Sequence, residues 1–157
     1  YNTAKLLEKF SKLNSFYEND AIYIYKKINI GFAVNIGDGL IVPVIKDANK
    51  LSLHEFSSKV NELVAKIKDR KITPEDLENG TFTITNLSKF NVLHFSPVIN
   101  SNQSGILGIS SEYDSCTIKD ENLAYDPKFN LTVAFDHRII DGKYVAEFLN
   151  ELKKNMQ

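Results

Sequence analysis

The residues best suited to chemistry stand near the C-terminus, from Asp136 to Gly142, between a predicted strand and a predicted helix. His137 lies four positions before Asp141, and an imidazole held at such a junction can act as a general base. Asp141 also suits the N-cap or first turn of the helix that follows. Arg138 could pair with Asp141, and Gly142 offers backbone freedom and room for close packing. The local sequence fits a catalytic and a structural His137 about equally well.

A second candidate is the hydroxyl of Thr85, which ends the strand predicted over Thr81–Thr85. It could donate a hydrogen bond to an oxyanion, although a threonine in a strand needs no role beyond its β propensity. The sequence alone cannot bring Thr85 and His137 together. It contains no GxSxG, P-loop or GxGxxG motif, which argues against serine hydrolases, NTPases and dinucleotide-binding proteins.

The other reactive side chains in the sequence, one cysteine and two histidines, give weaker evidence for a functional site. Cys116 is the only cysteine, so an internal disulfide and a CxxC motif are ruled out. It could be a nucleophile, but its polar surroundings favour a spectator thiol. His54 is predicted in the first turn of a helix and His94 in a loop, and the three histidines lack metal-ligand spacing. We therefore expect no metal site.

Length and composition predict one domain, or the greater part of one: the sequence has 157 residues, of which 43% are hydrophobic, and a net charge of −1. It has neither a basic, aromatic-interleaved stripe nor an apolar run of membrane-spanning length, so we expect no nucleic-acid or membrane partner. A reducing compartment fits the single cysteine, with the cytoplasm preferred and the mitochondrial matrix as the alternative. Because it opens at Tyr1 without a Met, the sequence is expected to begin inside a longer chain.

Periodicity, caps and turn residues predict the elements that must position these groups. Helical patterns cover four segments: 6–13, 52–69, a short helix from Thr73, and the segment after Gly142. Strand patterns cover six: 21–25, 28–34, 40–45, 81–85, 105–109 and 130–135. Pro43 implies an edge, a bulge or irregular pairing in the third of these strands. Strands and helices mix without strict alternation, which predicts an α+β fold with a mixed β-sheet flanked by helices.

Six blocks carry a family resemblance: NIGFAV (29–34), DGLIVPVIK (38–46), GTFTITNL (80–87), PVIN (97–100), ILG (106–108) and FDHRIIDG (135–142). In this order they resemble the catalytic domain of dihydrolipoamide acyltransferases, the core component of 2-oxoacid dehydrogenase complexes. The resemblance covers essentially the whole chain. It implies a chloramphenicol-acetyltransferase-like (CoA-dependent acyltransferase) fold.

The resemblance also implies an organisation. Residues 1–157 would form the acyltransferase catalytic domain without its N-terminal elements, and the lipoyl and peripheral-subunit-binding domains would lie outside this sequence. The sequence also ends before the apolar tail that joins trimers into larger cores. The implied partners are further copies in a homotrimer or higher assembly, a lipoyl domain, and the dehydrogenase components.

The implied chemistry is direct acyl transfer between the dihydrolipoyl thiol and coenzyme A, which enter a channel from opposite ends. His137 would be the general base, and Thr85 of a neighbouring subunit would bind the oxyanion. Asp141 would hold the architecture of the site, with Arg138 and Gly142 in support. The lipoyl group would be carried on a separate domain, and acetyl is the preferred acyl group.

The coenzyme side of the site is implied to include Asn86 and Ser88. Ser88 and Asn91 stand where the family usually has glycine, so this end is expected to be reshaped. Two alternatives remain beside the acyltransferase. One is a small-molecule O-acetyltransferase of the same fold, and the other is a non-catalytic assembly module.

Overall fold

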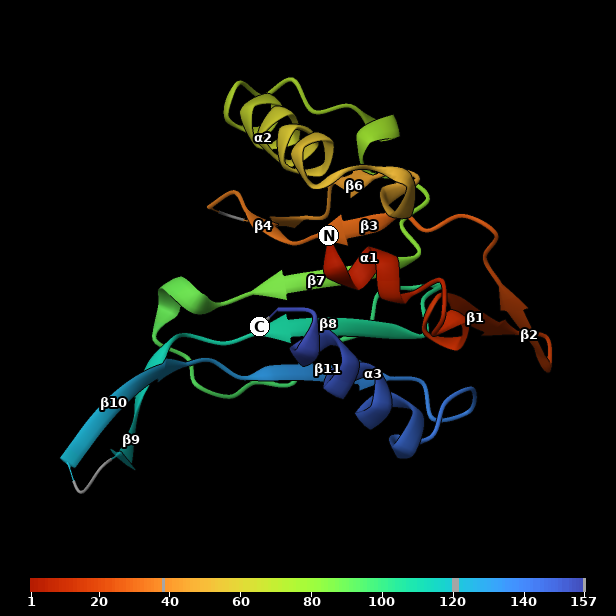
Figure 1. Cartoon of the computed structure of the whole chain (residues 1–157). Helices are drawn as coiled ribbons and strands as arrows, with labels where there is room; N and C mark the ends of the chain where they lie inside the picture. The colour runs from red at the N-terminus through yellow and green to blue at the C-terminus, as the bar shows by residue number, and fades with distance from the viewer. Residues whose placement is uncertain (38, 120–121, 157) are drawn as a thin grey trace.

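A five-stranded mixed sheet forms the centre of the chain in the computed structural model, which describes residues 1–37, 39–119 and 122–156 (Figure 1). The strands lie in the order β11 (Leu131–Phe135), β8 (Gly105–Ile109), β7 (Phe82–Asn86), β3 (Ile30–Phe32) and β6 (Val44–Ile45). β8 and β3 both run parallel to β7, whereas β11 and β6 pair antiparallel with their neighbours. The prediction of an α+β fold with a mixed sheet is confirmed.

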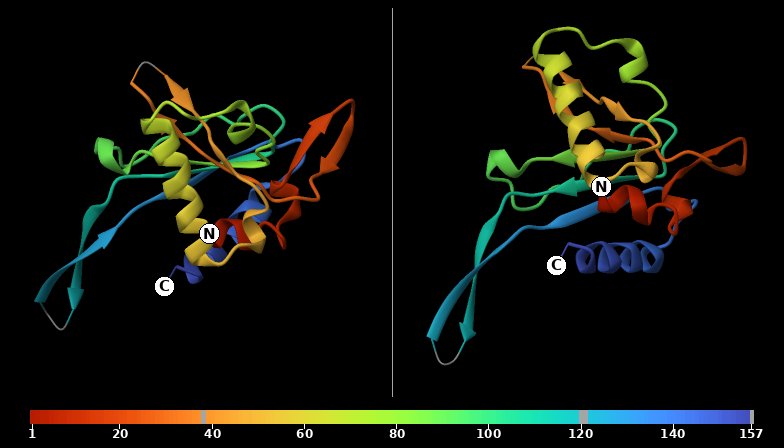
Figure 2. Two further views of the ribbon diagram at one scale, coloured as in Figure 1. Left: turned by 90° about the horizontal axis from the view of Figure 1, so that it is seen from above. Right: turned by 45° about the horizontal axis from the view of Figure 1, so that its top comes forward.

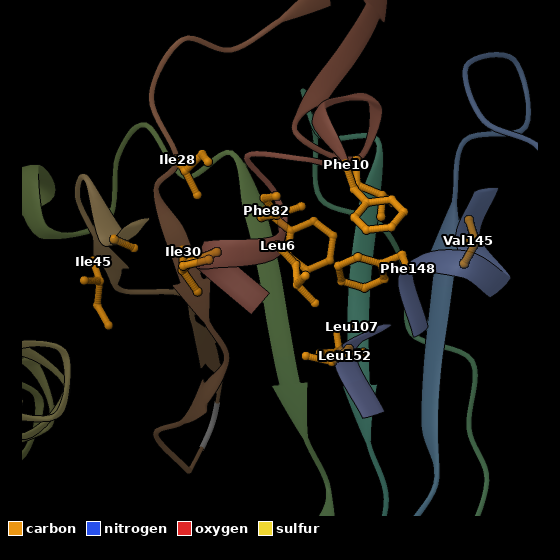
Figure 3. Close-up of a cluster of buried hydrophobic side chains, with 14 of the residues drawn as sticks. Leu6, Phe10, Ile28, Ile30, Ile45, Phe82, Leu107, Val145, Phe148 and Leu152 are labelled. Carbon is orange, nitrogen blue, oxygen red and sulfur yellow. The ribbon is translucent and has the colours of Figure 1, made fainter. Parts of the chain in front are cut away.

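Three α-helices pack against one face of this sheet: α1 (Asn2–Leu6), α2 (Leu53–Lys68) and α3 (Gly142–Lys154) (Figure 2). Their buried side chains join those of the strands in one hydrophobic cluster, in which Phe82 and Phe148 are completely buried (Figure 3). Burial of a side chain of this size contributes roughly 1.5–3 kcal/mol. No helix in the described part of the chain is long and apolar enough to cross a bilayer. Short 3-10 turns cover Ser11–Leu13, Ala48–Lys50, Pro74–Asp76 and Ser88–Phe90.

The helix predicted over 52–69 is α2, and its N-terminus has the predicted capping box. The Glu55 carboxylate accepts a hydrogen bond from the Ser52 backbone NH at 2.8 Å, and the Ser52 hydroxyl accepts one from the Glu55 NH at 3.3 Å. Such a cap is worth about 1 kcal/mol. Leu63 is buried in the predicted apolar stripe. Leu53 was assigned to that stripe wrongly: it is 62% exposed, because the first turn borders an open cavity that Met156 also lines.

The first predicted helix was only partly right. Leu6, Leu7, Phe10 and Leu13 are all buried, as the helical spacing indicates. However, α1 ends at Leu6, and the chain tightens into a 3-10 turn over Ser11–Leu13. The Lys9 NH already bonds to the Leu6 carbonyl at 3.0 Å, three residues back. The tighter turn keeps the apolar side chains on one side without a continuous α-helix.

The strand predicted over 40–45 is divided at Pro43. Pro43 is buried and has no NH to donate, and its carbonyl accepts a hydrogen bond from Phe32 at 3.0 Å. The irregular pairing expected at this proline is confirmed. The turn predicted over 37–39 includes residue 38, which lies outside the described residues. On either side of the break, β5 (Leu40–Ile41) pairs with β4 (Val34–Asn35), and β6 joins the main sheet.

Two hairpins were not fully predicted. β1 (Ser15–Glu18) pairs with β2 (Ala21–Ile24), of which only the second strand was expected. β9 (Tyr113–Lys119) pairs with β10 (Asn122–Lys128) and projects away from the main sheet (Figure 1). The prediction missed β9 and β10 because Asp, Ser and Pro lower their apparent strand propensity.

Gly105 marks a close approach of β8 to the core. A Cβ atom there would lie 2.9 Å from Leu13 Cδ2 and 3.1 Å from Phe82 Cε2, both in the buried cluster. Gly105→Ala should therefore lower the free energy of unfolding by about 1–3 kcal/mol, measured by urea denaturation. Gly142→Ala is the matched control, because a Cβ there meets no described atom within 4 Å. Equal stability of the two variants would contradict this assignment.

Candidate functional site

His137 lies in a turn between β11 and α3. The Ile139 and Ile140 NH groups donate to the Asp136 carbonyl at 3.0 and 3.1 Å, and both isoleucine side chains are buried. His137 is exposed, and its ring centroid lies 5.6 Å from that of Phe135. The apolar residues thus anchor the turn while the imidazole remains accessible, as a base requires.

Asp136 holds Arg138 within this turn. Its Oδ1 accepts from Arg138 Nε at 2.9 Å and its Oδ2 from Nη2 at 2.6 Å. The hydrogen-bonded guanidinium keeps the pKa of the Asp136 carboxyl below its ordinary value. The ion pair that the sequence suggested between Arg138 and Asp141 was wrong. Asp136, two residues away in the turn, presents both carboxylate oxygens to the planar guanidinium.

Asp141 is the N-cap of α3, as predicted. Its Oδ1 accepts a hydrogen bond from the Tyr144 NH at 2.9 Å. The packing and backbone freedom expected of Gly142 were not found. An added Cβ would meet no described atom within 4 Å, and the φ angle of Gly142 is not positive. The reason is that Gly142 lies in the exposed first turn of α3.

Tyr17 of β1 also contacts this turn. The Arg138 guanidinium carbon lies 4.3 Å from the centroid of the Tyr17 ring, a cation–π contact worth about 0.5–1 kcal/mol at an exposed site. The Tyr17 hydroxyl donates to Asp20 Oδ1 at 2.9 Å, within the β1–β2 hairpin. The sequence prediction missed Tyr17 because it missed β1. It also missed Asp136 as a support, although the Asp-x-Arg spacing was an available signal.

Arg138→Gln should raise the pKa of Asp136 toward the ordinary value of about 3.9, because it removes the cation. In the wild type the folded-state pKa is lowered, so the ionised pair stabilises the fold above the unfolded-state pKa. That contribution is lost as the pH falls through the folded-state pKa. The variant should therefore lose less stability than the wild type below about pH 4. NMR titration of the carboxyl and urea unfolding against pH measure this, and an unchanged Asp136 pKa would contradict it.

Thr85 lies near the other end of the sheet, in β7. It is half-buried and stands opposite Gly108 in the register of β7 and β8. A Cβ built on Gly108 would lie 2.8 Å from Phe95 Cζ, so Phe95 covers the sheet beside Thr85. The Asn86 side-chain oxygen accepts from the Ser88 NH at 2.8 Å and orders the following turn. Both Asn86 and Ser88 are exposed and can offer polar groups to a ligand.

Asn91 follows this turn with a φ angle of +54°, in the left-handed region. The resemblance gives glycine at this position, and glycine enters that region without steric cost. Asparagine tolerates this region better than most residues, which fits the φ angle that the turn requires at Asn91.

The chain does not bring Thr85 and His137 together. In the sheet register, Thr85 pairs with Gly108, and Gly108 pairs with Thr132 near the start of β11. His137 lies beyond Phe135, at the other end of β11. Five positions separate Thr132 from His137 along the sequence, and two strand spacings separate β7 from β11. At about 3.3 Å per residue along a strand and about 4.8 Å between neighbouring strands, the two side chains are on the order of 20 Å apart. Within one copy they cannot contact the same reacting atom.

The remaining candidates form no second site within the part of the chain that the structure describes. Among the described residues, no group of three or more His, Cys, Asp or Glu side chains is arranged to hold a metal ion. His54, His94 and Cys116 are all exposed. A cavity of about 860 Å³ at the start of β3 and β7 is lined by lysines and amides, and neither His137 nor Thr85 is among its lining residues.

The sequence matches a family model, 2-oxoacid dehydrogenases acyltransferase (catalytic domain), over residues 2–157. It is 38% identical over 151 residues to the dihydrolipoyllysine-residue acetyltransferase component of an acetoin cleaving system from Bacillus subtilis. It is 37% identical to the succinyltransferase component of a 2-oxoglutarate dehydrogenase complex from Buchnera aphidicola. These alignments cover 96% of this chain, and the chain spans less than two fifths of either relative's length.

Solved structures agree. A probable dihydrolipoamide acetyltransferase from Listeria monocytogenes superposes with a TM-score of 0.90 at 35% identity, over 98% of this chain and 66% of that one. A dihydrolipoamide acetyltransferase from Azotobacter vinelandii, studied for the roles of a serine, a histidine and an asparagine in catalysis, gives 0.86 at 30% identity over 98% and 64%. Chloramphenicol acetyltransferase gives 0.59 at 11% identity over 100% and 75%, which confirms the predicted fold. The chain belongs to the family of 2-oxoacid dehydrogenase acyltransferases, and it matches their catalytic domain.

Proposed function

We propose that this chain transfers an acyl group between the dihydrolipoyl thiol and coenzyme A, with His137 as general base. The observation that carries the proposal is the match to the family model over residues 2–157. Within the matched region, the junction between β11 and α3 presents an exposed histidine, His137. The hydrogen bonds between Asp136 and Arg138 in this turn support the proposal, because a base must be held in one orientation.

The proposed reaction needs only the two substrates and the side chains of the site. His137 takes the proton from the attacking thiol, and the sulfur bonds to the thioester carbonyl carbon. The tetrahedral intermediate then expels the other sulfur, which recovers the proton from the imidazolium. A thiol pKa of about 8.5 and an imidazole pKa of about 6.5 differ by roughly two units, a gap that proton transfer can cross at neutral pH. No acyl-enzyme forms, so Cys116 has no part in the reaction.

Thr85 is proposed to donate to the oxyanion, for which one well-placed donor is worth about 3 kcal/mol. The spacings support this assignment. In the Azotobacter enzyme the catalytic serine precedes the histidine by the same number of residues as Thr85 precedes His137. The catalytic asparagine follows it by the same number as Asp141 follows His137. We infer that Asp141 keeps the architecture of the site by capping α3, and that Arg138 supports it through its pairing with Asp136.

The complete site then needs two copies of the chain. Because Thr85 and His137 lie at opposite ends of one sheet, the hydroxyl that serves His137 must come from a neighbour. We propose a homotrimer in which each copy gives His137 to one interface and Thr85 to the next. The exposed Asn86 and Ser88 would contact coenzyme A beside Thr85, and the lipoyl group would arrive on a separate domain. That domain and the dehydrogenase components are the proposed partners.

Acetyl is the proposed acyl group, and the test is a panel of steady-state rates. Acetyl-, succinyl- and branched acyl-CoA would each be assayed with dihydrolipoamide as acceptor. We expect acetyl-CoA to give the highest kcat/KM; a higher value for succinyl-CoA would change the acyl assignment but not the reaction. Small alcohols in place of dihydrolipoamide test the O-acetyltransferase alternative. Turnover with alcohols but not with dihydrolipoamide would overturn the proposal.

A further inference from the structure

Residues 12–17 lie beside the turn that carries His137, although the two segments are far apart in the sequence. They lead from the 3-10 turn over Ser11–Leu13 into β1, at the end of the sheet where the chain passes from β11 to α3 (Figure 1). Tyr17 stacks on Arg138 there. The segment therefore contacts the turn from outside the 135–142 block of the sequence.

The backbone carbonyl of Lys12 is an internal hydrogen-bond acceptor. The Ser104 hydroxyl donates to it at 2.7 Å, and the Ser15 hydroxyl donates to it at the same distance. Both serines are completely buried. A buried hydroxyl that lost its partner would be costly, so these bonds hold both serines against residue 12.

Ser104 connects this acceptor to the His137 turn. Its own backbone carbonyl accepts a hydrogen bond from the Asp136 NH at 2.9 Å. Asp136 is the residue directly before His137, and the turn begins there. Ser104 thus bonds to Lys12 through its side chain and to Asp136 through its backbone. The position of the first residue of the turn therefore depends on where the Ser104 hydroxyl is held.

The backbone NH of Lys12 is bonded toward the other end of the turn. It donates to the Tyr144 hydroxyl at 3.4 Å, and the Tyr144 NH donates to the Asp141 carboxylate at 2.9 Å. The Tyr144 ring packs edge-on against Phe10, with the two ring centroids 5.3 Å apart. Two hydroxyl groups therefore link one peptide segment to both ends of residues 136–141.

We propose that Ser104 is a positioning residue for His137 in acyl transfer. Because Ser104 is completely buried, it does not touch the substrates, and it acts by limiting the movement of the residue before the imidazole. A displacement of about 1 Å at a reacting group can cost about 10²-fold in rate, so a bond that restrains the turn should affect kcat. This inference rests on the proposed function, because it takes His137 as the base.

Ser104→Ala and Ser15→Ala form a matched pair for the test. Each removes one buried hydroxyl from the Lys12 carbonyl, whereas the backbone of Ser15 pairs with Ile24 of β2 and not with the His137 turn. Both should lower the free energy of unfolding by similar amounts in urea. Only Ser104→Ala should lower kcat, by about tenfold, with the KM values of acetyl-CoA and dihydrolipoamide nearly unchanged. Equal kcat values for the two variants would overturn the proposal.

A double-mutant cycle tests whether Ser104 acts through His137. In a His137→Ala background the imidazole is absent, so adding Ser104→Ala should change the residual rate by less than about twofold. The same tenfold loss in both backgrounds would mean that Ser104 acts on the fold or on substrate binding, and the positioning role would be wrong. Full turnover by His137→Ala alone would instead contradict the proposed function.

Amide hydrogen exchange gives a measurement that needs no turnover. The Asp136 NH is bonded to the Ser104 carbonyl, so its exchange rate reports how firmly the turn is held. Ser104→Ala should speed this exchange about tenfold more than Ser15→Ala does. Ser104→Cys keeps a weaker donor at the same position and should show a smaller effect, and it replaces the alanine variant if that variant fails to fold. Exchange at Asp136 that matches Ser15→Ala would contradict the proposal.

Discussion

His137→Ala is expected to reduce kcat for acyl transfer by about 10²–10⁴-fold, the usual contribution of a general base. Without the imidazole, the attacking thiol must lose its proton to water, and only the small thiolate fraction present at neutral pH can react. The side chain is exposed and lies outside the hydrophobic cluster, so the fold and the assembly should be unchanged. Steady-state rates with acetyl-CoA and dihydrolipoamide, together with sedimentation, measure both.

His54→Ala is the control for this prediction, because His54 is an exposed histidine in the first turn of α2 and belongs to neither half of the proposed site. It should keep the wild-type rate. The loss of rate in His137→Ala relative to the wild type should also be smaller at pH 8 than at acidic pH, because a larger fraction of the thiol is ionised at pH 8. Full turnover by His137→Ala at neutral pH would remove His137 from the mechanism.

Thr85→Ala is expected to slow turnover by about 10²-fold through loss of the oxyanion donor. Its effect should fall on kcat more than on KM, because the hydroxyl acts in the transition state and not on the bound thioester. Thr85→Ser keeps the hydroxyl and is the matched control, for which we expect most of the activity to remain. Equal rates for the Ala and Ser variants would exclude the hydroxyl from catalysis.

Mixing the two inactive variants tests whether the site is shared. If chains of His137→Ala and Thr85→Ala are unfolded together and reassembled in equal amounts, some interfaces combine an intact His137 with an intact Thr85. Random assembly of a symmetric ring makes this about a quarter of the sites, so about a quarter of wild-type activity should return. Neither variant should recover when treated alone. No recovery in a mixture that assembles would place both groups in one copy and contradict the topology.

Much of the fold follows from local signals in the sequence. The Ser52–Glu55 capping box of α2 and the apolar spacing of Phe56, Val60 and Leu63 are local signals, and both were predicted correctly. Gly105–Ile109 was predicted to the residue, because its apolar run is flanked by turn residues. β9 and β10 were not predicted because their apolar residues, at Ile118 and Leu123, alternate with small or polar ones such as Thr117 and Ala124 and are exposed. A hairpin that buries little in its own chain leaves a weak hydrophobic pattern.

The site was predictable where it is local and not where it depends on topology. Asp141 as a helix cap follows from a carboxylate placed just before a helical pattern. The Asp-x-Arg spacing permits the pairing of Arg138 with Asp136, but the pairing also depends on the shape of the turn, which the spacing does not fix. The separation of Thr85 from His137 depended on which strands run parallel, and this is decided by the packing of the whole sheet.

The separation of Thr85 and His137 also has a genetic consequence. If each copy serves the interfaces on both of its flanks, a chain that folds and assembles but lacks both groups spoils two sites. In a cell that makes equal amounts of such a chain and the normal one, activity would fall well below half. A chain that lacks both groups would therefore act dominantly, whereas a defect in one group alone would remove only half of the sites, as a defect that prevents assembly would.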